Sequence, residues 1–243
     1  MSADHVRDGA QDVAHDGAHD GAHDAHDRAH AGASGASSGL DALGVRITAD
    51  DGVRRSETRV WDESARPHGP VREPGRTYTA RGRAVGAHLV EVHDHLRREL
   101  DEVRDLVRQV AEGIVQVGQA RSQISEMALR QNSWTLGGFC QSYCRIVTGH
   151  HSLEDEAVFP HLAASDPRLA TVIDRLQEEH RAIHHVLEGV DASLVHLVSE
   201  PRDIDRVSAA VDLLADTLLS HLAYEEAQLV EPLARHGFYG GQL

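Results

Sequence analysis

Apolar side chains recur at three- and four-residue spacing through most of the chain after about residue 84, the repeat of an amphipathic helix. The first run extends from about Ala84 to Val117. Its apolar stripe consists of Leu89, Leu96, Leu100, Val103, Val107 and Val110. No segment shows the strict alternation of apolar and polar residues that is typical of a strand. The sequence therefore predicts an all-α fold.

Three further helical runs follow the first. The second lies near Leu136 to Ala163. The Asp166-Pro167 pair after it predicts the start of a third helix, since Asp is a common N-cap residue and Pro is common at the first helical position. Glu200-Pro201 separates the third helix from the fourth. Their stripes are Leu169, Ile173, Leu176, Ile183, Leu187 and Leu194, then Val207, Val211, Leu214 and Leu218. Short connections make neighbouring helices antiparallel, so we expect an up-down-up-down four-helix bundle over residues 81–238.

The residues before the bundle have a different composition. Residues 1–40 contain a low-complexity repeat of Ala-His-Asp, which predicts a disordered tail because little apolar surface is available for burial. The repeated histidines of this tail indicate either a weak metal-collecting segment or a solvated spacer. Residues 41–80 contain Pro67, Pro70 and Pro74 and match no helical or strand pattern for long. We interpret them as a linker that is partly docked on the bundle.

Charge and composition argue against several classes of partner. The formal net charge is -15 at pH 7, and no basic run occurs, so binding to nucleic acid or to an anionic membrane is disfavoured. No apolar stretch is long enough for a membrane span, and the N-terminus lacks the layout of a signal peptide. Cys140 and Cys144 form no disulfide framework and are interpreted as packing residues. A cytoplasmic location is expected.

Polar residues interrupt the apolar stripes on every helix. His150 and Glu154, His180 and His184, and His221 and Glu225 are each separated by one turn, which places both members of a pair on one helix face. A single pair of this kind is usually a satisfied core histidine with a solvated partner. Three pairs on three successive helices, with His93 on the first, instead predict a buried metal site, because burying these groups without compensation is unfavourable.

Neighbouring residues compete for several of these assignments. On the first helix His93 lies about 60° from the centre of the apolar stripe, against about 80° for His88 and about 100° for His95. His93 is therefore preferred, although the sequence leaves His95 open. The other competing neighbours are His151, Asp155, His185 and Glu226.

The ordered set of motifs resembles the hemerythrin, or HHE cation-binding, family in its bacterial form over about residues 83–238. The matching segments are His93, HHSLE from His150 to Glu154, HRAIH from His180 to His184, and HLAYE from His221 to Glu225. This resemblance implies two iron ions with an oxo or hydroxo bridge, bridged also by Glu154 and Glu225. It implies that His180, His184 and His221 complete the coordination of one iron. His93 and His150 then bind the other iron, which keeps an open coordination position.

The resemblance implies a non-haem di-iron protein that binds or reacts with dioxygen, nitric oxide or hydrogen peroxide. A small diatomic molecule or peroxide is therefore the expected ligand, and the enzymatic form of this function would be catalase- or peroxidase-like turnover. A non-catalytic oxygen or redox sensor and an iron-binding or storage protein are the alternatives.

Three features depart from the family pattern. Oxygen-carrying hemerythrins usually have an Asp five residues after the last His, whereas Glu225 and Glu226 stand here, so either glutamate is a candidate ligand. Tyr143 lies two turns before His150 on nearly the same face, where it either hydrogen-bonds at the iron site, ligates an iron, or is an aromatic core residue. The 57-residue interval between His93 and His150 predicts longer helices or an added helix at one end of the bundle.

Overall fold

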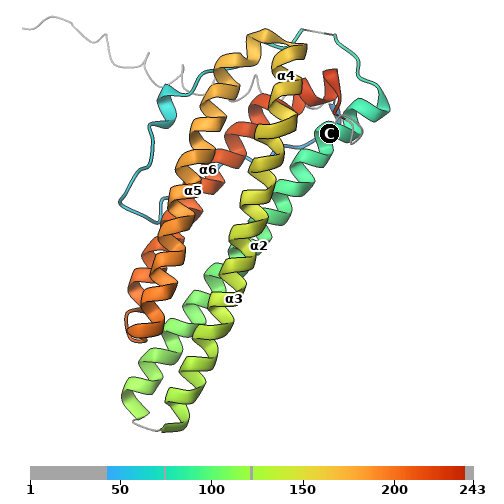
Figure 1. Cartoon of the computed structure of the whole chain (residues 1–243). Coiled ribbons are helices and arrows are strands. Elements are labelled where there is room, and N and C mark those ends of the chain that lie inside the picture. Colours follow the sequence, from blue (N-terminus) through green and yellow to red (C-terminus); the bar gives the residue numbers. More distant parts are fainter. Residues whose placement is uncertain (1–42, 74, 121–122, 239–243) are drawn as a thin grey trace, which may run out of the picture.

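The computed structural model describes residues 43–73, 75–120 and 123–238, apart from the side chains of residues 114–135 and 139. Four long helices make up the bundle: α2 (Ala80–Ala120), α3 (Gln123–Leu153), α5 (Ala170–Ser199) and α6 (Ile204–His236). α2 contacts α3 and α6, and α5 contacts the same two helices, so the four form a closed ring (Figure 1). Successive helices are antiparallel, which confirms the predicted all-α four-helix bundle.

The second and third long helices, α3 and α5, are joined through three short segments. α3 continues into a π-helical turn, η3 (Glu154–Val158), and then into α4 (Phe159–Ser165). Asp166 ends α4, and its side chain accepts a hydrogen bond from the backbone N–H of Arg168 in η4 (Pro167–Leu169). The helix start predicted at Asp166-Pro167 is therefore confirmed, since η4 leads directly into α5.

α2 and α3 are long enough to account for the interval between His93 and His150. They span 41 and 31 residues, and their joined ends extend past the connection between α5 and α6 (Figure 1). Of the two forms predicted for this interval, longer helices are the one observed.

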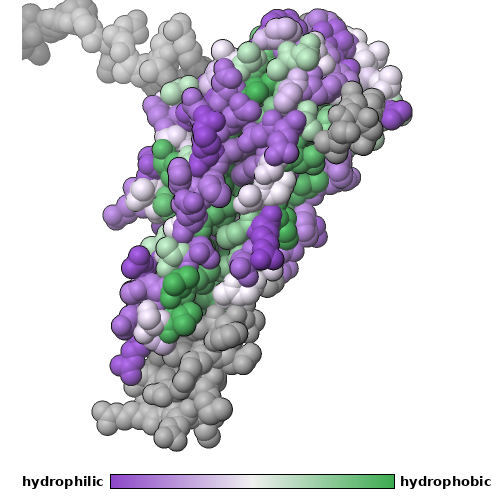
Figure 2. Space-filling view, viewed as in Figure 1, coloured by the Kyte–Doolittle hydropathy of each residue, from purple (hydrophilic) through white to green (hydrophobic). Residues whose placement is uncertain are grey.

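The apolar core divides into two clusters along the bundle. One gathers around Leu96, Leu100, Ile183 and Leu214, and the other around Leu89, Phe159, Leu176 and Leu229. His93 and His180 fall between the two clusters in sequence on their helices, and His221 lies next to Leu222, where the first cluster ends on α6. Apolar packing therefore lies on both sides of them. The outer face in Figure 2 is mainly hydrophilic, in agreement with apolar stripes that turn inward.

α2 and α6 approach each other closely near the end of α6. A Cβ atom on Gly82 would lie 2.1 Å from the backbone oxygen of Ala234, and one on Gly86 would lie 2.8 Å from that of Val230. Both distances are shorter than van der Waals contact, so only glycine permits this approach of the two helix backbones.

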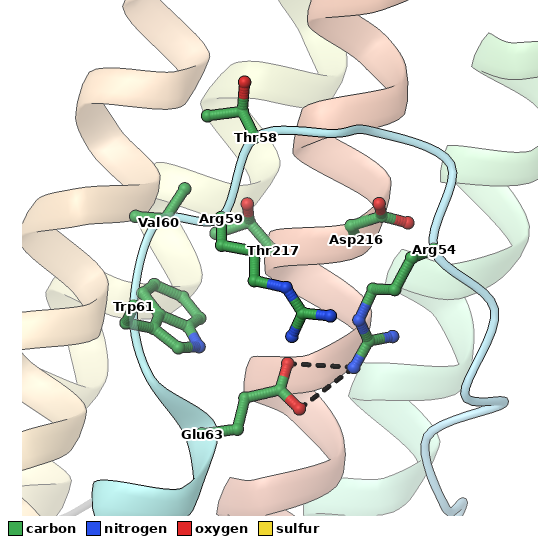
Figure 3. A pocket seen from close by; sticks show the side chains of 8 residues that line it. All are labelled: Arg54, Thr58, Arg59, Val60, Trp61, Glu63, Asp216 and Thr217. Atoms are coloured by element: carbon green, nitrogen blue, oxygen red, sulfur yellow. Dashed lines mark hydrogen bonds and ion pairs between the residues drawn. The ribbon is translucent and has the colours of Figure 1, made fainter.

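Residues 43–73, called the strap below, lie against the bundle and include the short 3₁₀ helix η2 (Glu63–Ala65). Leu43 and Val45 are buried in the core, and the backbone N–H of Gly69 donates to the side chain of Gln228 on α6 at 2.8 Å. Where the strap crosses α6, Arg54 pairs with Glu63 beside Asp216 and Thr217 (Figure 3). The cavity left there measures only about 20 Å³, room for about one water molecule.

None of the helices that the structure describes is both long and apolar enough to cross a membrane.

Candidate metal centre

Seven ligand-type side chains meet at mid-bundle in two adjoining clusters. The first cluster consists of His93, His150, Glu154 and Glu225, and the second of His151, His180 and His221. Within each cluster the candidate ligand atoms all lie within 4.8 Å of one another. The residues come from α2, α3, η3, α5 and α6, and six of the seven are buried. His150, the seventh, is nearly so, with 10% of its side chain exposed.

The two carboxylates of the first cluster lie between its histidines and those of the second cluster. Glu154 turns Oε1 toward His150 Nε2 at 3.2 Å and Oε2 toward His180 Nε2 at 3.6 Å. Glu225 places Oε2 at 3.6 Å from His93 Nε2 and at 3.4 Å from His221 Nε2. Each glutamate therefore faces a histidine of both clusters, which is the position that a carboxylate bridging two cations would occupy.

Buried polar atoms without a hydrogen-bond partner concentrate at this point. They include Nε2 of His151, His180 and His221, Oε2 of Glu154 and both carboxylate oxygens of Glu225. Buried polar groups in proteins are nearly always satisfied, so these atoms need a further binding partner. Imidazole nitrogen and carboxylate oxygen are common donors for first-row transition metals, and the residues present therefore fit a metal ion.

Three outer carboxylates orient the cluster histidines. Glu226 Oε1 lies 3.0 Å from Nδ1 of His93, Asp155 Oδ1 lies 2.9 Å from Nδ1 of His180, and Glu179 Oε2 lies 3.1 Å from Nδ1 of His221. A carboxylate accepts the proton of Nδ1–H, which leaves the lone pair on the inward Nε2. This tautomer is the one that a metal ligand requires.

Burial holds several of the imidazoles neutral. It lowers the pKa of His150 to about 3, assisted by the neighbouring His93. Burial also lowers the pKa of His151 and of His180, and the charges of neighbouring histidines act in the same direction. Neutral imidazole is the metal-binding form, so burial keeps these three side chains ready to bind without loss of a proton.

The pKa values of the two central carboxyl groups, Glu154 and Glu225, and of His221 are shifted by more than burial. Burial and the adjacent Glu225 raise the pKa of Glu154 well above its ordinary value. Burial opposes ionisation of Glu225, but the close contact with His221 and the charges of the nearby histidines lower its pKa. Burial likewise opposes protonation of His221, yet its hydrogen bond to Glu179 and the adjacent Glu225 carboxylate raise its pKa. Burial therefore favours the neutral form of Glu154, whereas the surrounding histidines favour the ionised form of Glu225.

The local helix geometry explains this convergence. His150 and Glu154 are one turn apart at the end of α3, and His221 and Glu225 are one turn apart on α6. The π-helical turn begins at Glu154, directly beside the clusters, and π-turns are often found at functional sites. Its next residue, Asp155, reaches His180 on α5.

The structure brings together six of the seven predicted ligands, namely His93, His150, Glu154, His180, His221 and Glu225, and leaves His184 outside. The side chain of His184 is 56% exposed and faces Glu188 at 3.5 Å. The buried face of α5 includes His180, Ile183 and Leu187, so His184 lies at its edge. The geometry therefore places His184 outside both clusters.

His151 lies in the second cluster with His180 and His221. Its ring stacks on that of His180 with centroids 4.0 Å apart. The sequence signal for it is the His150-His151 doublet, in which His151 is the competing neighbour of the predicted ligand. Consecutive residues of a helix lie about 100° apart, but both reach the interior here because α3 faces α2 on one side and α5 on the other.

Burial and side-chain contacts distinguish the other residues that the sequence offers as alternative ligands. His95 is half exposed and pairs with Glu99, whereas His93 is buried in the cluster. Glu226 is an outer partner of His93, and Glu225 is the inner carboxylate. Tyr143 is a buried core residue whose hydroxyl donates to the backbone oxygen of Leu96 at 3.1 Å. Both cysteines are free thiols.

A surface cavity reaches the second cluster. It has a volume of about 440 Å³, lies between α3 and α5, and is lined by His151 and His180 with Asp155. Exposed His184 and His185 also line it. The cavity gives solutes a path toward the buried imidazoles.

Fold and site together define a helical-bundle protein with buried histidine and glutamate clusters suited to cations. A family model described as the hemerythrin HHE cation binding domain matches residues 84–233. The chain belongs to this family. No curated protein and no solved structure matches the chain.

Proposed function

We propose that the chain is a non-haem di-iron protein in which one cation is held by His151, His180 and His221 and the other by His93 and His150. Glu154 and Glu225 bridge the two. The observation that carries this proposal is the placement of both glutamates between the clusters, 3.2–3.6 Å from histidines on either side.

Iron is favoured by the donor set and by the family. Five imidazoles and two carboxylates suit Fe(II) and Fe(III), and the two carboxylates offset part of the cations' charge. Similar donor sets also accept zinc, cobalt or manganese, so metal identity is a matter for measurement.

The proposed ligand is dioxygen, nitric oxide or hydrogen peroxide. The His93–His150 side offers two imidazoles where the other offers three, so the cation there keeps room for a small molecule. Bound iron would supply the redox chemistry. The chain's own residues orient the imidazoles, hold the carboxylates between the cations, and surround them with apolar packing that limits water.

The first experiment is anaerobic reconstitution with ferrous ion followed by metal analysis. Two irons per chain are expected for the unaltered protein, with loss of iron in His93→Ala. His95→Ala is the matched control, because it removes an exposed imidazole from the same helix and should retain both ions. Failure of the unaltered chain to retain iron would overturn the proposal.

The second experiment separates the forms of the function. Optical spectra of the ferrous protein are recorded before and after addition of dioxygen, nitric oxide and hydrogen peroxide. Repeated consumption of peroxide supports catalase- or peroxidase-like turnover, whereas reversible spectral changes without consumption support a sensor. Iron that is bound and released without any response to these ligands supports storage.

A further inference from the structure

Two carboxylates outside the clusters connect cluster histidines to the strap. Glu179 on α5 contacts His221, and Glu226 on α6 contacts His93. Both carboxylates are buried, with exposed fractions of 1% and 0%. A buried carboxylate needs hydrogen bonds on its remaining lone pairs, and the strap supplies part of them in both cases.

Arg66 of the strap makes a two-pronged contact with Glu179. Its Nε donates to Oε1 at 2.8 Å and its Nη2 donates to Oε2 at 2.9 Å. Oε2 is also the oxygen that faces His221 Nδ1 at 3.1 Å. Arg175 donates to Oε1 at 2.9 Å. The two parallel hydrogen bonds fix the plane of the Glu179 carboxylate. They thereby fix the position of the oxygen that orients the His221 ring.

The guanidinium of Arg66 is itself immobilised. It lies 5.4 Å from the ring centroid of Trp61 and 4.7 Å from that of Tyr224. Tyr224 Oη donates to the backbone oxygen of Pro67 at 2.7 Å, and Arg66 Nη1 donates to Ser220 Oγ at 2.9 Å. Strap and α6 therefore clamp Arg66 next to the residue that precedes His221.

The contact at Glu226 uses the strap backbone. The N–H of Thr48 donates to Oε2 of Glu226 at 2.7 Å, while Oε1 accepts from Arg97 at 2.7 Å and faces His93 Nδ1 at 3.0 Å. Every oxygen of this carboxylate is thus occupied, one by the strap and the other by α2.

We propose that the strap is a positioning element of the metal centre: Arg66 acts through Glu179 on His221, and Thr48 acts through Glu226 on His93. The inference rests on the proposed function, since it concerns how the chain holds cations. Partners that orient ligating histidines typically change metal affinity about 10–100-fold when removed. The strap reaches one histidine from each cluster, so its removal should affect both cations.

The test compares Arg66→Met, Arg66→Lys and Arg55→Met in the full chain, with cobaltous ion alone as probe. Met keeps the apolar stem between Trp61 and Tyr224 but removes the donors, and Lys keeps the charge without the two-pronged geometry. Arg55 is the matched control: it also pairs with a buried α6 carboxylate, Asp216, at 3.2 Å, and Asp216 belongs to neither cluster. Affinity and the visible spectrum of bound cobalt are measured.

Arg66→Met should lower the affinity for cobaltous ion at the site of His151, His180 and His221 about 10-fold or more, and should alter the visible spectrum of the bound ion. Arg66→Lys should restore part of the affinity, and Arg55→Met should match the unaltered chain. For the second contact, Thr48→Pro removes the N–H that reaches Glu226, whereas Thr48→Ala keeps it. Only Thr48→Pro should lower the affinity for the cation held by His93 and His150.

Unchanged affinity and spectrum in both Arg66→Met and Thr48→Pro would overturn the inference while leaving the proposed function intact. An equal loss in Arg55→Met and Arg66→Met would also overturn it, because general loosening of the strap would then explain the effect. If the unaltered chain binds no metal, the proposed function fails first, and that result is distinguishable from the other two.

Discussion

His151 and His184 line the same surface cavity, but they differ in burial and in neighbours. His151 is 6% exposed and stacks on His180, while the side chain of His184 is 56% exposed and pairs with Glu188. His151→Ala should therefore remove the cation held with His180 and His221, whereas His184→Ala should retain it. Iron per chain after reconstitution measures this difference. Equal loss in the two variants, or loss only in His184→Ala, would contradict the assignment.

Glu179 and His221 make the stability of the metal-free chain depend on pH. Burial opposes ionisation of Glu179, but hydrogen bonds from His221 and Arg66 prevail and lower its pKa from 4.5 to about 2. A lowered pKa adds stability that is complete above about pH 4.5 and is lost as pH falls toward 2. The raised pKa of His221 adds stability that is complete below about pH 6.5 and is lost at higher pH.

The pair should accordingly stabilise the metal-free chain most between about pH 4.5 and 6.5. The Glu179 shift corresponds to about 3 kcal/mol, from roughly 1.4 kcal/mol per pKa unit. Urea unfolding of the unaltered chain and of Glu179→Gln, from pH 2 to 8, measures the difference in free energy of unfolding. A difference that does not shrink toward pH 2 would show that Glu179 carries no such effect.

At the scale of elements, the contact between α2 and α6 depends on two glycines. Gly82→Ala should destabilise the fold, because the new Cβ would lie 2.1 Å from the backbone oxygen of Ala234 and the helices would have to separate. A loss of about 2 kcal/mol is expected, in the range for overpacked sites. Thermal unfolding measures it.

Gly113→Ala is the control for this prediction. Gly113 is also within α2, and nothing lies within 4 Å of a Cβ built there. The substitution should stabilise the chain by about 0.5–1 kcal/mol through helix propensity. If both alanine variants were stabilised, the close contact of α2 and α6 would not be a constraint.

The four long helices could be predicted from sequence because their apolar positions repeat at the helical period, and burial follows that period at residues such as Leu96, Ile183 and Leu214. Six of seven predicted ligands converge for the same reason. The sequence does not single out His151, because α3 packs against both α2 and α5 and so buries a wide face. The angle between a residue and the centre of one apolar stripe underestimates the width of such a face.

The strap could be predicted only as a linker that is partly docked. Its contacts are a backbone N–H at Thr48 and a guanidinium at Arg66, each meeting a carboxylate more than a hundred residues away. Such contacts have no period in sequence. The partners of Glu179 and Glu226 therefore appear only once α5 and α6 are placed beside the strap.

At the scale of the whole molecule, the buried centre links metal binding to folding. Without cations the bundle must bury unpartnered atoms of His151, His180, His221, Glu154 and Glu225, which is unfavourable. A cation that binds only the folded chain stabilises it by about 2.7 kcal/mol when present at a hundred times its Kd. Two cations should raise the Tm by roughly 10–20 °C for a domain of this size.

Circular dichroism during heating, under anaerobic conditions with and without ferrous ion, measures this shift. Glu225→Ala is the appropriate control: it removes the carboxylate that faces both His93 and His221, so the added metal should no longer raise its Tm. Histidines of residues 1–40 offer metal the same sites in both proteins, so their contribution cancels in the comparison. A Tm that rises equally in the two proteins would place the stabilising metal outside the bundle, whereas a rise confined to the unaltered chain locates it at the two clusters.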